Sequence, residues 1–110
     1  MTFPSYVAVV TSFADRDTAE RVAETLVAER LAACAQLLGP QHSIYRWKDA
    51  IEHATEWRLE LKTAAARLTA LERRLLELHP YEVPEFIVLP IVDGNDAYLR
   101  WVGESTRTTE

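Results

Sequence analysis

The sequence predicts an α+β domain in which two helices cover one face of a four-stranded antiparallel sheet. Two short apolar runs, residues 6–10 and 86–91, have the composition of strands that are buried on both faces. A third stretch, residues 57–62, alternates apolar and charged side chains, as a strand with one buried face does. Two segments between the strands repeat apolar residues at helical spacing. The order β-α-β-β-α-β, with right-handed crossovers, predicts a ferredoxin-like sandwich, and an extra helix follows at the C-terminus.

The first helix is predicted shortly after the first strand. Asp17, with Glu20 three residues later, resembles a capping box at the start of this helix. Behind it, apolar residues recur at helical spacing up to about Arg30: Ala19, Val22, Ala23, Leu26 and Val27. This stripe predicts an amphipathic helix.

The second strand and its connection to the third contain turn-forming residues. The strand is expected to start near Ala33, to break at Gly39-Pro40 and to resume over residues 43–47. The polar residues 48–55 predict a hairpin connection longer than a tight two-residue turn. The third strand then directs one set of apolar residues to the helices: Trp57, Leu59 and Leu61.

Two further helices are predicted in the second half of the chain. Thr63 is the expected cap of the second helix, whose apolar stripe is Leu68, Leu71, Leu75 and Leu78. Asn95 or Asp96 is expected to cap a last short helix that contains Tyr98, Leu99, Trp101 and Val102. From Glu104 onward the chain is polar. We therefore expect one domain over residues 1–110, with an ordered core over about 5–104 and a frayed tail over 105–110.

Length, charge and cysteine content limit the class of protein. A chain of 110 residues is expected to form one domain with a core of its own. Its net charge of −5 argues against a nucleic-acid partner, because surfaces that bind phosphate backbones are usually basic. The lone Cys34 allows no intrachain disulfide, and no stretch resembles a leader or a membrane span. We therefore expect a cytoplasmic protein that contacts neither nucleic acid nor membrane.

The face of the sheet that the helices leave open predicts self-association. The first strand points Val7 and Val9 to one side but Ala8 and Val10 to the other, and the fourth strand is apolar on both sides as well. Each large aliphatic side chain left in water forfeits about 1.5–3 kcal/mol. Monomers rarely expose an apolar patch of this kind, so a second copy of the chain is the expected cover.

The segment His79-Pro80-Tyr81-Glu82-Val83-Pro84-Glu85 joins the second helix to the fourth strand. Pro80 disfavours helical dihedral angles at the residue before it, and Pro84 cannot donate a hydrogen bond to a sheet ladder. The prolines therefore indicate a stiff connector. The same stiffness also suits a cleft, which would be lined by four polar side chains of the segment: His79, Tyr81, Glu82 and Glu85. The two interpretations are compatible.

The sequence contains no strong catalytic or metal-binding motif. It has no C-x-x-C, no histidine pair at helical spacing, no calcium loop and no glycine-rich phosphate loop. His42 and His53 fall in segments that resemble loops and are expected to be solvated. Tyr45 and Trp47 either pack or line a ligand cleft. An enzyme using His79 and Glu82 as base and acid would lack a nucleophile, so we expect no enzyme.

Several stretches resemble the CutA divalent-cation-tolerance family. The resemblance covers about residues 7–106, and the segment 79–85 is its most specific part. The matching stretches are Leu31-Ala32-Ala33-Cys34, Ser43-Ile44-Tyr45-Arg46-Trp47, Lys62-Thr63, residues 79–85 and Tyr98-Leu99-Arg100-Trp101. The resemblance implies a ferredoxin-like fold, a trimer built like the PII signalling proteins, and an association with copper and other divalent cations.

Two functions follow from this resemblance. The first is a homotrimer that binds copper or another divalent cation, for which Cys34 and His79 are the candidate ligands because thiols and imidazoles suit such ions. The alternative is a PII-like regulatory trimer that senses a small anion or nucleotide in clefts between subunits. Its candidate ligand-cleft residues are Tyr45, Arg46, Trp47, Lys62, Tyr81, Glu82 and Glu85.

Three residues are candidates for the assembly. Arg58 and Glu60 leave the third strand on the face opposite the helices, where we expect them to pair within or between chains, because a lone buried charge is strongly destabilising. If the face is wet, the pair contributes about 1 kcal/mol or less. Pro84 is expected to order the fourth strand and thereby support assembly.

Overall fold

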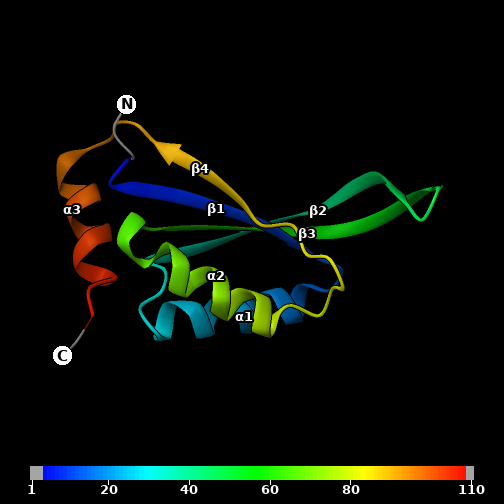
Figure 1. Cartoon of the computed structure of the whole chain (residues 1–110), viewed down its shortest axis with the longest axis horizontal. Helices are drawn as coiled ribbons and strands as arrows, with labels where there is room; N and C mark the ends of the chain where they lie inside the picture. The colour runs from blue at the N-terminus through cyan, green and yellow to red at the C-terminus, as the bar shows by residue number, and fades with distance from the viewer. Residues whose placement is uncertain (1–3, 109–110) are drawn as a thin grey trace.

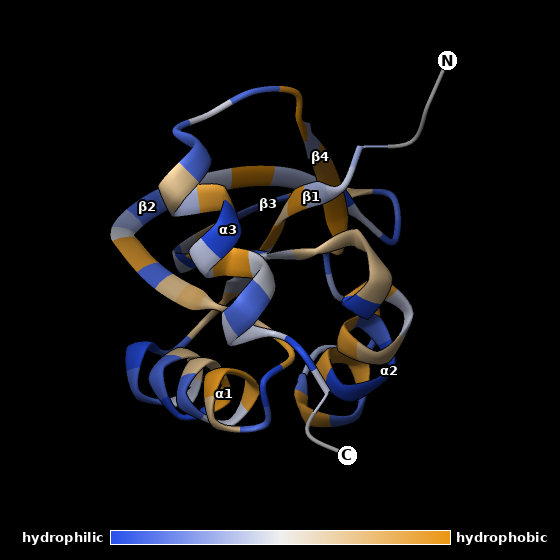
Figure 2. Cartoon of the chain, turned by 90° about the vertical axis from the view of Figure 1, so that its left-hand side faces the viewer, coloured by the Kyte–Doolittle hydropathy of each residue, from blue (hydrophilic) through white to orange (hydrophobic). Residues whose placement is uncertain are grey.

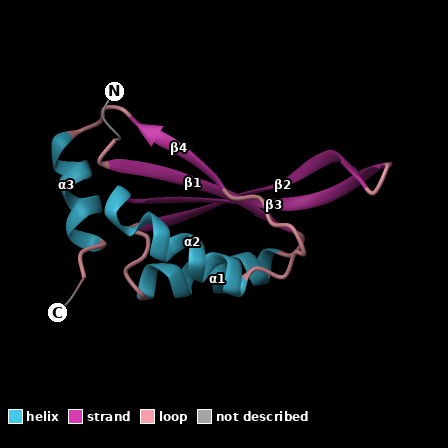
Figure 3. Ribbon diagram, in the orientation of Figure 1, coloured by secondary structure: helices cyan, strands magenta, loops and turns pink. Residues whose placement is uncertain are grey.

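The computed structural model describes residues 4–108. These residues form four strands and three α-helices, with a short 3₁₀ helix before the second of them (Figures 1 and 3). In chain order these are β1 (Tyr6–Phe13), α1 (Arg16–Ala28), β2 (Cys34–Trp47), β3 (Ala50–Ala64), η1 (Ala65–Arg67), α2 (Leu68–Leu78), β4 (Ile87–Ile91) and α3 (Asp96–Ser105).

The four strands form one antiparallel sheet in the order β2-β3-β1-β4. Helices α1 and α2 lie on the same side of this sheet, and α3 lies at one end of it (Figures 1 and 2). This arrangement confirms the predicted ferredoxin-like sandwich with an extra C-terminal helix. The helix α2 ends where Pro80 predicted, because His79 has extended dihedral angles.

The core fills the space between the sheet and the two long helices. The sheet contributes alternate residues of its two central strands, and the helices contribute their predicted apolar stripes, except that Val27 of α1 is exposed. The fully buried members include Val9, Phe13, Leu59 and Leu61 from the sheet and Ala19, Leu26, Leu71 and Leu75 from the helices. Burial of these side chains is what holds the helices on this face.

Two predicted helix caps are wrong. The cap of α1 is Asp15, whose carboxylate accepts hydrogen bonds from the amide and the hydroxyl of Thr18. Asp17 instead lies in the first turn, where its charge complements the helix dipole. Thr63 belongs to β3, is fully buried, and donates its hydroxyl hydrogen bond to the carbonyl of Leu31. A buried hydroxyl needs such a partner, and this one joins β3 to the loop after α1.

The β2–β3 hairpin differs from the expected long connection. Lys48 and Asp49 form a two-residue turn with φ angles of 50° and 66°, the conformation that suits the twist of the flanking strands. Residues 50–55 therefore belong to β3. At Gly39-Pro40 the second strand does not stop but bulges, and its register shifts between Leu38 and Gln41. Beyond this bulge the hairpin projects past the ends of α1 and α2 (Figure 1).

The C-terminal helix is longer than expected. Asn95 caps α3 by accepting from the amides of Ala97 and Tyr98, as predicted. The helix continues to Ser105, and Thr106 is fully buried with its hydroxyl bonded to the carbonyl of Val102. The ordered chain therefore extends past residue 104, and the end of the expected frayed tail, residues 109–110, lies outside the described residues.

The sheet face opposite α1 and α2 remains partly apolar and exposed. Ala8 and Val10 of the central strand point to this face as expected, but they are already buried within one chain and do not need a second copy to cover them. Leu38 (47%), Ile87 (47%) and Leu89 (42%) on the flanking strands remain exposed. Cover by a second copy stays a prediction. Within residues 4–108, no helix has the length and apolarity needed to cross a membrane.

Candidate functional site

A cleft of about 680 Å³ lies between the segment after α2 and one face of the β2–β3 hairpin. Residues 80–85 form one wall, and the opposite wall consists of Ser12, Ser43, Tyr45, Trp47 and Glu56. The hairpin residues are two apart along each strand, so they share one face of the sheet. The volume is in the range of small-molecule sites, about 300–1,000 Å³.

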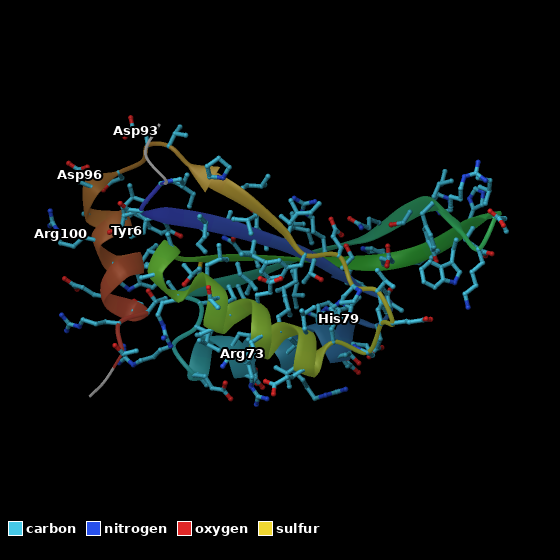
Figure 4. The ribbon with its side chains drawn as sticks, in the orientation of Figure 1. Tyr6, Arg73, His79, Asp93, Asp96 and Arg100 are labelled. Atoms are coloured by element: carbon cyan, nitrogen blue, oxygen red, sulfur yellow. The ribbon has the colours of Figure 1, made fainter. Side chains whose placement is uncertain are left out.

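His79 directly precedes the wall formed by residues 80–85, but it is buried and does not line the cleft, contrary to expectation (Figure 4). Its ring stacks on Phe13 with centroids 4.1 Å apart, and its Nε2 atom lies 2.9 Å from the carbonyl oxygen of Ser12. Its Nδ1 atom accepts from the amide of Tyr81 at 3.2 Å. These partners require the neutral tautomer with the proton on Nε2. Burial lowers the pKa of His79, while the Ser12 carbonyl and Glu56 act in the opposite direction.

Tyr81 and Glu56 join the two walls of the cleft. The Tyr81 hydroxyl donates a 2.6 Å hydrogen bond to Oε2 of Glu56. Burial raises the pKa of Tyr81, and the hydrogen bond to the carboxylate raises it further, because both oppose formation of a phenolate. The phenol therefore stays protonated and holds residue 81 against the base of the hairpin.

A second polar contact fixes Glu85. Its carboxylate accepts a 3.0 Å hydrogen bond from Ser12, and the Ser12 hydroxyl in turn lies 3.5 Å from the amide nitrogen of Gln41. The sequence-based prediction missed Ser12, Ser43 and Glu56 as lining residues of the cleft. The period-two alternation from Trp47 and Tyr45 back to Ser43 could have found one of them, but only the strand register identifies Glu56.

The charges of the cleft favour a cationic ligand. Three carboxylates line it, from Glu56, Glu82 and Glu85, and no lysine or arginine is among its lining residues. Of the predicted ligand-cleft residues, the structure brings together Tyr45, Trp47, Tyr81, Glu82 and Glu85. Arg46 projects from the opposite face of the hairpin, and Lys62 lies farther along β3, where it donates to Gln36.

The two predicted metal ligands lie apart within one chain. Cys34 is paired with Lys62 of β3, whereas His79 contacts Ser12, whose partner on β3 is Arg58. Four residues of strand separate these positions by roughly 13 Å. Both ring nitrogens of His79 already have backbone partners, so neither is free to bind a metal in this arrangement.

Cys34 has a different neighbour. Its Sγ atom lies 3.5 Å from the hydroxyl of Tyr98 in α3, and this contact raises the pKa of Tyr98 to about 12. Across residues 4–108, no three His, Cys, Asp or Glu side chains come close enough to hold a metal together. A site with several protein ligands would therefore need a second copy, and the role of Cys34 and His79 as ligands stays a prediction.

Arg58 and Glu60 occupy the strand positions expected for them. Glu60 lies 4.0 Å from the ammonium of Lys62, and both side chains are less than one-third exposed. In the described part of the chain, no ion pair joins Glu60 to Arg58. Pro84 lines the cleft three residues before β4 begins, so the strand starts after the proline, as expected.

Comparison with known proteins identifies the family. The family model described as "CutA1 divalent ion tolerance protein" matches residues 7–105. The chain is 40% identical over 98 residues to the divalent-cation tolerance protein CutA of Thermus thermophilus, covering 89% of this chain and 95% of that protein. It is 38% identical over 107 residues to the CutA protein of Citrobacter koseri, covering 97% of this chain and 93% of that protein.

Solved structures agree with the sequence comparison. The crystal structure of CutA1 from Shewanella sp. SIB1 matches with a TM-score of 0.93 and 36% identity, covering 97% of this chain and all of that one (100%). CutA1 from Oryza sativa matches with a TM-score of 0.91 and 33% identity, covering 99% of this chain and 100% of that one. The chain belongs to the CutA1 divalent ion tolerance protein family.

Proposed function

We propose that the chain forms a homotrimer that binds divalent cations, copper above others, and acts without catalysis in the cytoplasmic response to metal ions. The observation that carries this proposal is the family match over residues 7–105. Relatives that align over most of the chain are named divalent-cation tolerance proteins. The acidic cleft adds support, because carboxylates attract cations.

Assembly is part of the same proposal. Exposed Leu38, Ile87 and Leu89 provide an apolar surface that a second copy would bury. Because no three suitable side chains meet within residues 4–108, a site with more than two protein ligands requires residues from another subunit. The trimer would therefore create metal ligation that a single chain lacks.

Native mass spectrometry of tag-free protein at micromolar concentration tests the proposal. We expect a mass three times the 12.5 kDa of one chain, and a metal-dependent mass increase when Cu²⁺ is added. Light scattering provides an independent mass. A monomer mass would contradict the trimer, and a trimer without saturable copper uptake would contradict the metal function.

A regulatory trimer that senses a small ligand is the second candidate, favoured by the aromatic cleft. Its walls include Tyr45, Trp47 and Tyr81, which can stack on a flat ligand. The three carboxylates disfavour the anion or nucleotide expected from the family architecture and favour an organic cation. A thermal-shift series with metals, nucleotides and organic cations separates the candidates, because a bound ligand raises the melting temperature with concentration.

Arg58 and Glu60 give the assembly its own test. A double-mutant cycle with Arg58→Met, Glu60→Gln and both together is measured on trimer dissociation. We expect coupling above about 1 kcal/mol if the subunit contact buries the pair. The Lys62 contact of Glu60 predicts that Lys62→Met also couples to Glu60→Gln. Coupling within error of zero in both cycles would leave these charges solvated.

Pro84→Ala is expected to weaken assembly through a less ordered β4, and an unchanged mass and melting temperature would refute that role.

A further inference from the structure

The β2–β3 hairpin carries two histidines whose rings meet across the strands. His42 is paired with Thr55 and His53 with Ile44, so all four side chains lie on one face of the hairpin. The Nε2 atom of His42 lies 2.9 Å from Nδ1 of His53, and the ring centroids are 5.1 Å apart. Both histidines are exposed, and this face is opposite the one that lines the cleft. They lie on strands rather than in the loops expected from the sequence.

We propose that His42 and His53 together bind a divalent cation that prefers imidazole ligands, with Cu²⁺ or Ni²⁺ as the best fit. Two nitrogens that each lie about 2.0–2.1 Å from one ion are about 2.9 Å apart at a right angle and about 3.3 Å apart in a tetrahedron. The separation of 2.9 Å matches the right angle. Right angles between neighbouring ligands are typical of tetragonal copper(II) and nickel(II) sites.

The hydrogen-bonded pair binds an ion when both rings turn so that their facing nitrogens point to one position beside the line that joins them. In the free pair one ring donates its N–H to the other, so a proton lies between the two nitrogens. When an ion binds, this proton leaves the facing nitrogen, and the ring that donated it carries a proton on its outer nitrogen instead. Both imidazoles then remain neutral, which is the form that binds metals. The strand ladder and the tight turn at Lys48-Asp49 hold the two rings in register.

The surroundings predict an open, reversible site. Both rings are exposed, so water can occupy the remaining coordination positions. Within residues 4–108, no third histidine, cysteine or carboxylate joins the pair closely enough to be a ligand. The charged residue that shares this hairpin face is Arg46, diagonal to His53, and it opposes a bound cation. The site is therefore expected to exchange its ion with the solvent.

The inference rests on the proposed divalent-cation function and assigns it a site. It differs from that function because the pair is complete within one chain and does not require the trimer. It also differs from the Cys34 and His79 assignment, whose two side chains lie apart. The position and the ligand set are properties of this chain's own hairpin.

Copper titration of the full-length, tag-free protein tests the site. Isothermal titration with Cu²⁺ gives the affinity, and electron paramagnetic resonance counts the bound imidazole nitrogens. We expect one Cu²⁺ per chain with two nitrogens in the wild type. His42→Gln and His53→Gln should each raise Kd about tenfold or more, because each leaves a single ligand. Thr55→Ala, on the same hairpin face, is the matched control and should keep the wild-type Kd and spectrum.

Three results would overturn the site. If both glutamine variants bind Cu²⁺ as the wild type does, the pair is not the site. If binding is lost instead in Cys34→Ser, the metal function stands but its site lies elsewhere. If the wild type takes up no Cu²⁺, both the site and the proposed metal function fail. Circular dichroism of each variant verifies that the exposed substitutions leave the fold intact.

Discussion

His79 and the pair formed by His42 and His53 differ in the hydrogen-bond partners of their ring nitrogens. His79 is 7% exposed, stacks on Phe13, and has a backbone partner at each ring nitrogen. The side chains of His42 and His53 are exposed. Within residues 4–108, each of these two rings has only the other as its side-chain hydrogen-bond partner. A buried histidine with both nitrogens satisfied acts as a structural residue, whereas an exposed pair retains lone pairs for a ligand.

The largest effect is expected for the buried histidine. His79→Ala removes the ring that packs on Phe13 and leaves the Ser12 carbonyl and the Tyr81 amide without partners. We expect a loss of about 2–4 kcal/mol in the free energy of unfolding. Urea unfolding monitored by circular dichroism measures it. The exposed His53→Ala is the control, with an expected change within about 0.5 kcal/mol. Equal effects of the two substitutions would refute the contrast.

The bulge that joins the core sheet to the projecting hairpin should give the next largest effect. Gly39 has φ of 155°, and a Cβ atom there would lie 2.9 Å from the ring of Trp57. Gly39→Ala is therefore expected to destabilise the protein by about 1–3 kcal/mol. Gly94→Ala is the matched control, because its Cβ would make ordinary contacts of 3.4 Å or more with Leu99. Similar unfolding midpoints for the two variants would show that the bulge tolerates a side chain.

A smaller effect should appear in the pH dependence of stability. Burial holds the pKa of folded His79 below its ordinary value of 6.5. As the pH falls through 6.5, the unfolded chain therefore takes up a proton before the folded chain does, and stability declines until the folded pKa is passed. The free energy of unfolding should fall as the pH is lowered from 8 to 5, both in the wild type and in His53→Gln. His79→Gln should lose this decline. An unchanged pH dependence in that variant would show that His79 does not cause the decline.

Much of the fold followed from the sequence because its signals were local. Apolar periodicity located the strands and helices, and Pro80 marked the end of α2. The cap of α1 was misplaced because Asp15 and Asp17 are both acceptable capping residues, and only the backbone decides between them. The hairpin was misread because Lys48 and Asp49 are not the usual residues for a turn with positive φ.

The candidate site was less predictable because it depends on strand register. The segment 79–85 identified one wall of the cleft, and the aromatic residues Tyr45 and Trp47 indicated part of the other. Glu56 lies between the predicted link over residues 48–55 and the predicted strand over residues 57–62, so its bond to Tyr81 had no signal in the sequence. His42 and His53 are eleven residues apart, and only the pairing of β2 with β3 brings their rings together.

The imidazole nitrogens themselves give the most direct test of this contrast. Long-range ¹H–¹⁵N correlation spectra distinguish the tautomer and ligation of each histidine, and Zn²⁺ is a diamagnetic probe for them. We predict that Zn²⁺ shifts the ring nitrogens of His42 and His53 together, while His79 keeps the signature of a neutral ring protonated at Nε2. Zinc-dependent shifts at His79, with His42 and His53 unchanged, would contradict the account.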